Sequence, residues 1–190
     1  MSRLTCLALV LCCALPLPTQ AAGPANRAAL QQQQDALRKL ERYDGTWRGE
    51  AISYQADGTR LQLVQTERVG PMLDGTLRVI EGRGYAGDGT LVFNAFAVIS
   101  FSPQSNRYHF RSHAQGYSGD FPMEVTDEGF SWSIPAGAAT IRYTSRVKDG
   151  TWTEIGERVE PGREPVKIFE MRLQRIGNTD WPAAGAVGPR

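Results

Sequence analysis

From Gly45 onward, recurring turn residues divide the chain into short segments, and this spacing constrains the fold more than any other feature. Nine breaks, among them Asp57-Gly58 and Asp149-Gly150, leave ten candidate strands. These lie at about 45–55, 59–69, 72–85, 90–101, 107–114, 120–125, 130–134, 139–147, 151–159 and 165–175. Short connections that carry Asp-Gly favour hairpins over helical crossovers, so the pattern predicts an antiparallel meander.

Side chains alternate within these segments as they do in a sheet with one buried face. Phe130, Trp132 and Ile134 fall on one face of their strand, with serines between them on the other. Ten consecutive hairpin strands fit a sandwich or a closed barrel, and closure removes exposed sheet edges without a disulfide. The sequence therefore predicts an all-β fold, an antiparallel up-and-down barrel of about ten strands over residues 45–176.

The first 21 residues have the pattern of a signal peptide. They contain one positive charge, an apolar run and small residues before a cleavage position after Ala21. The run reaches about 12 residues before Pro16, whereas a membrane helix needs about 20. We expect an exported protein, in the bacterial periplasm or secreted, without a membrane anchor.

Two further segments flank the predicted barrel. Residues 22–44 are rich in helix-forming side chains and end in basic residues before a glycine, which predicts an N-terminal helix. Its thin leucine stripe fits a brace on the barrel or a partner-binding surface. Residues 177–190 are typical of a flexible tail.

Composition excludes several classes of function. Cys6, Cys12 and Cys13 are the only cysteines and all lie in the leader, so a processed chain would have no disulfide or thiol chemistry. Cleavage would also remove one of the 21 basic residues and so balance the 20 acidic ones. A neutral domain without a basic block gives no electrostatic reason to bind nucleic acid or an anionic membrane.

A glycine and a tryptophan open the first strand, at Gly45 and Trp47, and Arg175 lies in the last strand. In a closed meander these strands pair, so Arg175 would stack on Trp47 with a cation–π attraction of about 0.5 to 2 kcal/mol. The helix, this "GTW" and a meander ending "FEMRLQRIG" resemble the lipocalin-like (calycin) superfamily. More narrowly, they resemble a bacterial family of small exported lipocalin-like domains of unknown function. The resemblance implies that these three residues close the barrel, and ten strands are closer to fatty-acid-binding and nitrobindin-like barrels than to eight-stranded lipocalins.

Candidate ligand-binding residues form a polar group and an apolar group. His109, Arg111 and His113 share one strand face, and Arg142 alternates in the same way on a later strand. Facing outward, they would be a solvated surface; facing inward, they would bind a carboxylate or another anionic head group. Apolar candidates for contacts with a ligand tail, which a packed core would need equally, are Phe93, Trp132, Phe169 and Met171.

Patterns for metal binding and catalysis are weak. His109 and His113 stand about 13 Å apart on a strand, at roughly 3.3 Å per residue, which is too far to share one ion. One of them could ligate a haem iron, although nitrobindin-like barrels carry that histidine nearer the C-terminus. The "GYSGD" around Ser118 lacks the last glycine of a nucleophile elbow, and no phosphate-binding loop occurs. We therefore expect no catalytic set, no metal and no cofactor.

Three hypotheses follow. The first is an exported lipocalin-like domain that binds a small hydrophobic or amphipathic molecule in the barrel interior. The second is a non-binding structural or protein-interaction domain of the cell envelope, with a filled interior. The third is an enzyme that uses His109 or His113 as a base. The volume of the interior distinguishes the first hypothesis from the second, and the sequence leaves the ligand and the oligomeric state open.

Overall fold

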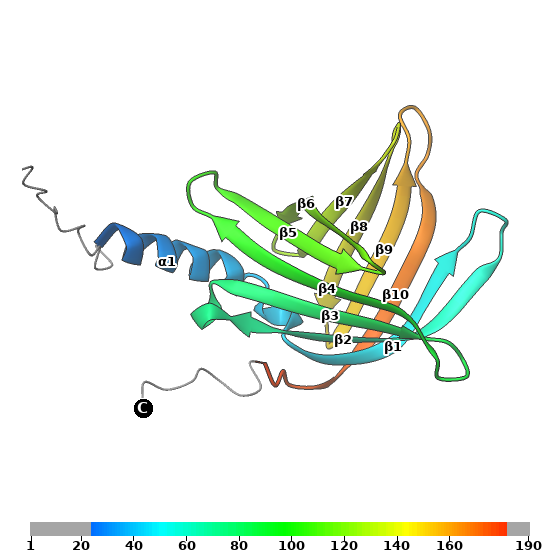
Figure 1. Cartoon of the computed structure of the whole chain (residues 1–190), viewed down its shortest axis with the longest axis horizontal. Helices are drawn as coiled ribbons and strands as arrows, with labels where there is room; N and C mark the ends of the chain where they lie inside the picture. Colours follow the sequence, from blue (N-terminus) through cyan, green and yellow to red (C-terminus); the bar gives the residue numbers. More distant parts are fainter. Residues whose placement is uncertain (1–23, 182–190) are drawn as a thin grey trace, which may run out of the picture.

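The alternating segments after Gly45 pair as ten antiparallel strands that close on themselves (Figure 1). The computed structural model describes residues 24–181, so the predicted signal peptide and the end of the predicted tail lie outside the described residues. The strands are β1 (Gly45–Tyr54), β2 (Arg60–Met72), β3 (Leu77–Tyr85), β4 (Leu91–Ser102), β5 (Arg107–Ala114), β6 (Tyr117–Val125), β7 (Gly129–Ala136), β8 (Ala139–Lys148), β9 (Thr151–Val159) and β10 (Val166–Gly177). β1 pairs with both β2 and β10, which leaves the sheet without an open edge. The predicted all-β barrel of ten strands is confirmed.

One strand boundary differs from the sequence prediction, which placed a break at Gly70-Pro71. Strand β2 continues through both residues to Met72, and the turn is the short 3-10 helix η2 (Leu73–Gly75). The pairing of β2 with β1 ends at Val69, opposite Gly45. Because Pro71 lies beyond this last pair, its missing N–H removes no hydrogen bond to β1.

The second difference is at the β5–β6 turn, which was expected over Gly116 to Gly119. Gln115 and Gly116 both have positive φ, 50° and 85°, and they complete the reversal by themselves. Tyr117 already begins β6. The remaining glycine, Gly119, is a strand residue whose missing side chain leaves room for the ring of Phe121.

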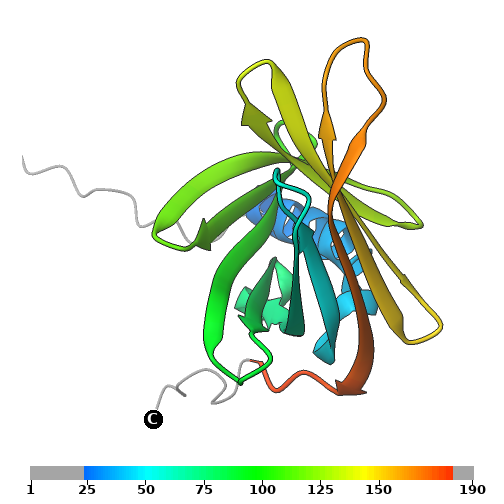
Figure 2. The same ribbon diagram turned by 90° about the vertical axis from the view of Figure 1, so that its right-hand side faces the viewer.

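Helix α1 (Pro24–Arg38) and the 3-10 helix η1 (Glu41–Tyr43) cover one end of the barrel. Leu37, Leu40 and Tyr43 are at most 1 % exposed, and the Tyr108 hydroxyl donates to the Ala36 carbonyl at 2.9 Å. Figure 2, viewed from the opposite end, shows α1 behind the ring of strands. The C-terminal part of the helix is therefore a brace on the closed end. Within residues 24–181, no helix has the length and apolar character needed to cross a membrane.

The closed end is organised around Trp47, which is 1 % exposed. Its ring centroid lies 4.5 Å from the guanidinium carbon of Arg175, its partner across the β1–β10 pair. The indole N–H donates to the Tyr43 carbonyl at 2.8 Å, and the ring meets Trp152 edge-on at 5.6 Å. A side chain at Gly45, where φ is 139°, would collide with the Arg175 guanidinium. The structure thus places Gly45, Trp47 and Arg175 together at the β1–β10 pair, where the barrel closes.

Asp44 connects this arrangement to a second arginine. Its carbonyl accepts a hydrogen bond from Arg175, and its carboxylate forms an ion pair with Arg78, with Nε and Oδ1 3.3 Å apart. The Arg78 side chain is almost fully buried. Burial raises the pKa of Asp44 to about 6, against the lowering effect of Arg78. A single residue before the first strand therefore connects β10 with β3 at the barrel floor, across β1 and β2.

We expect Arg175→Ala to destabilise the fold by about 2 kcal/mol, because it removes the cation from Trp47 and two hydrogen bonds to the carbonyls of Arg42 and Asp44. Urea unfolding monitored by tryptophan fluorescence measures the loss. Arg172→Ala, an exposed change on the outer face of the same strand, is the matched control. Equal stability of the two variants would contradict the role of Arg175 in closure.

Candidate functional site

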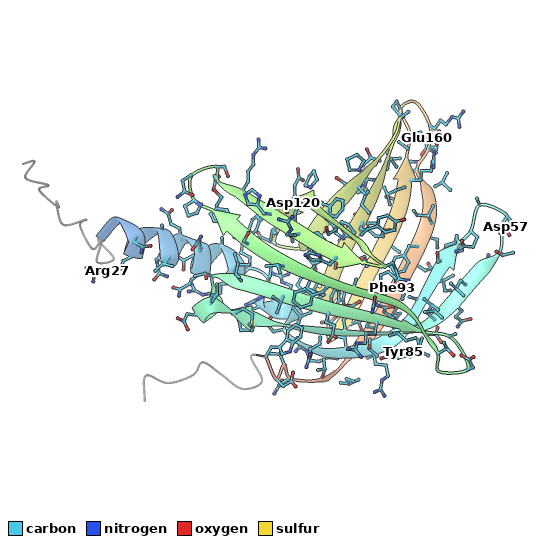
Figure 3. The ribbon with its side chains drawn as sticks, in the orientation of Figure 1. Arg27, Asp57, Tyr85, Phe93, Asp120 and Glu160 are labelled. Carbon is cyan, nitrogen blue, oxygen red and sulfur yellow. The ribbon has the colours of Figure 1, made fainter. Side chains whose placement is uncertain are left out.

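The inward-facing side chains of the strands leave a cavity of about 440 Å³ inside the barrel. It extends from the hairpin tips, where Leu61 and Ile134 line it, down to Trp152 near the closed end. In Figure 3, Asp57 and Glu160 mark hairpin tips at the open end and Arg27 marks the helix on the far side. Its lining is mainly apolar and comes from most of the strands, including Leu63, Ile80, Val92, Phe93, Ala95, Ala97, Phe110, Ala114, Phe130, Trp132, Tyr143, Phe169 and Met171.

Aromatic rings form one continuous wall of this cavity. Trp132 and Tyr143 are stacked, with ring centroids 4.5 Å apart and planes 11° apart. Phe110 lies 4.8 Å from Trp132, and Phe169 lies 6.0 Å from Tyr143. These rings come from strands β5, β7, β8 and β10, so the wall extends over the part of the barrel from β5 to β10, which is more than half of it.

Small residues form the facing wall. Gly82, Ala95, Ala97 and Ala114 on β3 to β5 point inward and line the cavity. At Gly82 the missing side chain makes room for Glu67, because a Cβ there would lie 2.7 Å from a carboxylate oxygen of that residue. The short side chains at Ala95, Ala97 and Ala114 leave space in the interior beside the large residues of the same strands.

Two carboxyl groups lie deep in the cavity, Glu67 on β2 and Glu154 on β9. Glu67 is six residues along β2 from Leu61 at the open end, a distance of about 20 Å along the strand. The Gln65 side chain donates to the Glu67 carboxylate at 2.7 Å. Both acids are partly accessible to solvent, which reaches them through the cavity.

The environment holds both carboxyl groups in a readily protonated state. Burial raises the pKa of Glu67 to about 8, and the charge of Glu154 adds to this effect while the Gln65 hydrogen bond opposes it. Burial likewise raises the pKa of Glu154 to about 7, against a hydrogen bond from Ser145. The Ser145 hydroxyl oxygen also accepts from the Trp152 N–H at 2.6 Å. Among the described residues that line the cavity, none is a lysine, arginine or histidine.

The structure separates the two groups of residues that the sequence proposed for ligand binding. The four apolar candidates, Phe93, Trp132, Phe169 and Met171, all line the cavity. They are therefore available for contact with a ligand rather than closed into a filled core.

The polar candidates lie outside the barrel. His109, Arg111 and His113 are exposed on the outer face of β5, because Phe110 on the same strand points inward. Arg142 is exposed on β8 and donates to Glu157 at 2.8 Å. These side chains therefore form a solvated outer surface, as one of the two predictions had it. The other prediction, that they point inward and bind an anionic head group, is wrong. Alternation alone could not decide between them, because both faces of β5 carry polar side chains.

The outward positions of His109 and His113 affect two hypotheses, haem binding and catalysis by a histidine. The chain has two histidines, and both lie on the outer surface, so the cavity offers no imidazole to a haem iron. A histidine-ligated haem therefore does not fit the interior. A base at His109 or His113 would likewise act on the outer surface and not inside the cavity.

Glu67 and Glu154 were not among the residues predicted from the sequence, although a signal was present. On β2, Glu67 shares its face with the buried Val69, so strand alternation places this acid inside the barrel. On β9, Trp152 is buried, and the residue two positions on is Glu154. An acidic residue within an apolar strand face was the available indication.

Comparisons with known proteins agree with the fold. No family model matches the sequence, and no curated protein matches it. Among solved structures, the chain is similar to one described as the crystal structure of Rv2717c from M. tuberculosis. The TM-score is 0.56 at 10 % sequence identity, over 74 % of this chain and 96 % of that one. At this identity the likeness shows the fold alone, and the closed barrel is consistent with the lipocalin-like fold expected from the sequence.

The raised pKa values predict a loss of stability as pH increases. The folded state keeps protons on Glu67 and Glu154 that the unfolded chain releases above about pH 4.5. The contribution of these two residues to the free energy of unfolding is therefore fully present below that pH and is lost as the pH rises through 7 to 8. Urea unfolding at about pH 5 and pH 9 measures this change. We expect the double variant Glu67→Gln, Glu154→Gln to lose less stability than the unaltered protein over this interval, by several kcal/mol, since each pKa unit corresponds to about 1.4 kcal/mol. Parallel losses in both proteins would contradict the assignment.

Proposed function

We propose that this chain is an exported lipocalin-like domain that binds a small hydrophobic or amphipathic molecule inside its barrel. The observation that carries the proposal is the cavity of about 440 Å³ with mainly apolar walls. Protein interiors are normally close-packed, and binding sites for drug-sized molecules have volumes of about 300 to 1,000 Å³. Export is proposed from the signal-peptide pattern in residues 1–21.

The side chains that bound the cavity support binding over a purely structural role. A domain that needed only a stable core would gain from larger residues at Ala95 and Ala114, which pair across β4 and β5 and both line the cavity. The placement of two polar groups at the bottom of an apolar space is also typical of ligand sites, where a few polar atoms orient an otherwise apolar molecule.

We expect Ala95→Phe and Ala114→Phe to weaken the binding of a neutral apolar dye, N-phenyl-1-naphthylamine, by about tenfold or more, because each ring would occupy the cavity. Fluorescence titration of the purified protein measures the dissociation constant. His113→Phe is the matched control, since it places the same ring on the outer face one residue before Ala114.

Three results are informative in this titration. Weaker binding by the two inward variants with unchanged binding by the control supports the interior site. Equal effects in all three variants would place the dye on the outer surface. No dye binding by the unaltered protein, at concentrations where apolar carriers bind it, would favour the structural alternative with a closed interior.

A further inference from the structure

We infer that the ligand is a hydrophobic amine, held with its ammonium group between Glu67 and Glu154 and its apolar part along the aromatic wall toward the open end. This inference rests on the proposed function and names the chemical class of the ligand.

The charged residues that line the cavity, among those described, are all acidic. Glu67 and Glu154 are its only acidic or basic lining residues among those described, so no basic residue of the lining neutralises them. The side chain of Arg78 is buried nearby at the closed end, but it is paired with Asp44 and does not line the cavity. A buried carboxylate without a counter-charge is costly, and a cation supplied by the ligand offsets that cost.

The positions of Glu67 and Glu154 allow both carboxyl groups to interact with one ammonium group of a ligand. They lie on β2 and β9, which are separated in the barrel only by β1 and β10. Both side chains line the same cavity, and repulsion by the charge of Glu154 is one of the contributions that raise the pKa of Glu67. An ammonium group between them would replace this repulsion by two attractions and could donate hydrogen bonds to both.

The surrounding side chains suit an organic cation with an apolar body. Met171 is the direct cross-strand partner of Glu154, and Tyr143 is near enough for the Glu154 charge to raise its pKa. Tyr143 is stacked on Trp132, and such ring faces attract ammonium groups. Above them, Phe93 and Phe169 supply apolar contacts toward the open end. A fatty-acid carboxylate in the same position would face two acids and no buried basic partner.

The test compares ligands that share a tail and differ in head group: decylamine, decanol and decanoate. Each displaces N-phenyl-1-naphthylamine from the purified protein at about pH 8.5, where Glu67 and Glu154 are substantially ionised and the amine is charged. We expect decylamine to bind about tenfold more tightly than decanol, and decanoate to bind most weakly. Glu67→Gln and Glu154→Gln each reduce the preference for the amine over the alcohol by about fivefold, because amine binding weakens much more than decanol binding. Glu157→Gln, on the outer face of β9, changes neither.

The outcomes separate this inference from the proposed function. Equal displacement by all three ligands, or preferred binding of decanoate, overturns the amine and leaves an apolar binding site. A change in decanol binding as large as the change in amine binding shows that the glutamates act through structure alone, and this also overturns it. Absence of dye binding overturns the proposed function itself. The comparison of the three ligands on the unaltered protein needs no variant, so a variant that fails to fold does not remove the test.

Discussion

The pairing of β1 with β10 is the constraint on which the rest of the structure depends. All three cysteines lie in the first 13 residues, so the described barrel has no covalent cross-link and its closure rests on the sheet and on core burial. The contact between Trp47 and Arg175 fixes the register of this pair, since a slip of one residue would turn Trp47 to the outside. With that register set, every inward face follows, including the faces that carry the two buried acids. A site deep in the cavity is thus positioned by an interaction at the closed end.

The interior combines two features that each lower stability. One is an unfilled space next to small residues such as Ala95 and Gly82, and the other is a pair of acids, Glu67 and Glu154, without a basic partner among the described lining residues. Buried ionisable groups are commonly less stabilising than apolar side chains of the same size. When sequence choices that oppose stability coincide at one place, function is the usual reason. A ligand with an apolar body and a positive charge would compensate for both features at once.

The sequence predicted the architecture well because the relevant signals are local. Turn residues such as Asp149-Gly150 ended the strands, and alternation around Trp132 identified an inward face. The polar candidates on β5 failed for the opposite reason: both faces of that strand carry polar atoms, and only the closed barrel shows that Phe110 points inward. Glu67 and Glu154 are 87 positions apart in the chain, and their proximity depends on barrel closure. The ion pair of Asp44 with Arg78 could not be predicted from the sequence either, because it also forms between residues that only the folded barrel brings together.

The most direct test of the amine site is to observe the two carboxyl groups while a ligand binds. Carbon-detected NMR of protein labelled at the glutamate side-chain carboxyl carbon, assigned with the Gln variants, follows the pKa of Glu67 and Glu154 with and without decylamine. The structure predicts raised pKa values, about 8 and about 7, in the free protein. A bound ammonium group favours the ionised form, so both values should fall toward those of an ordinary glutamate. Unchanged carboxyl titrations in protein saturated with the amine would contradict the site.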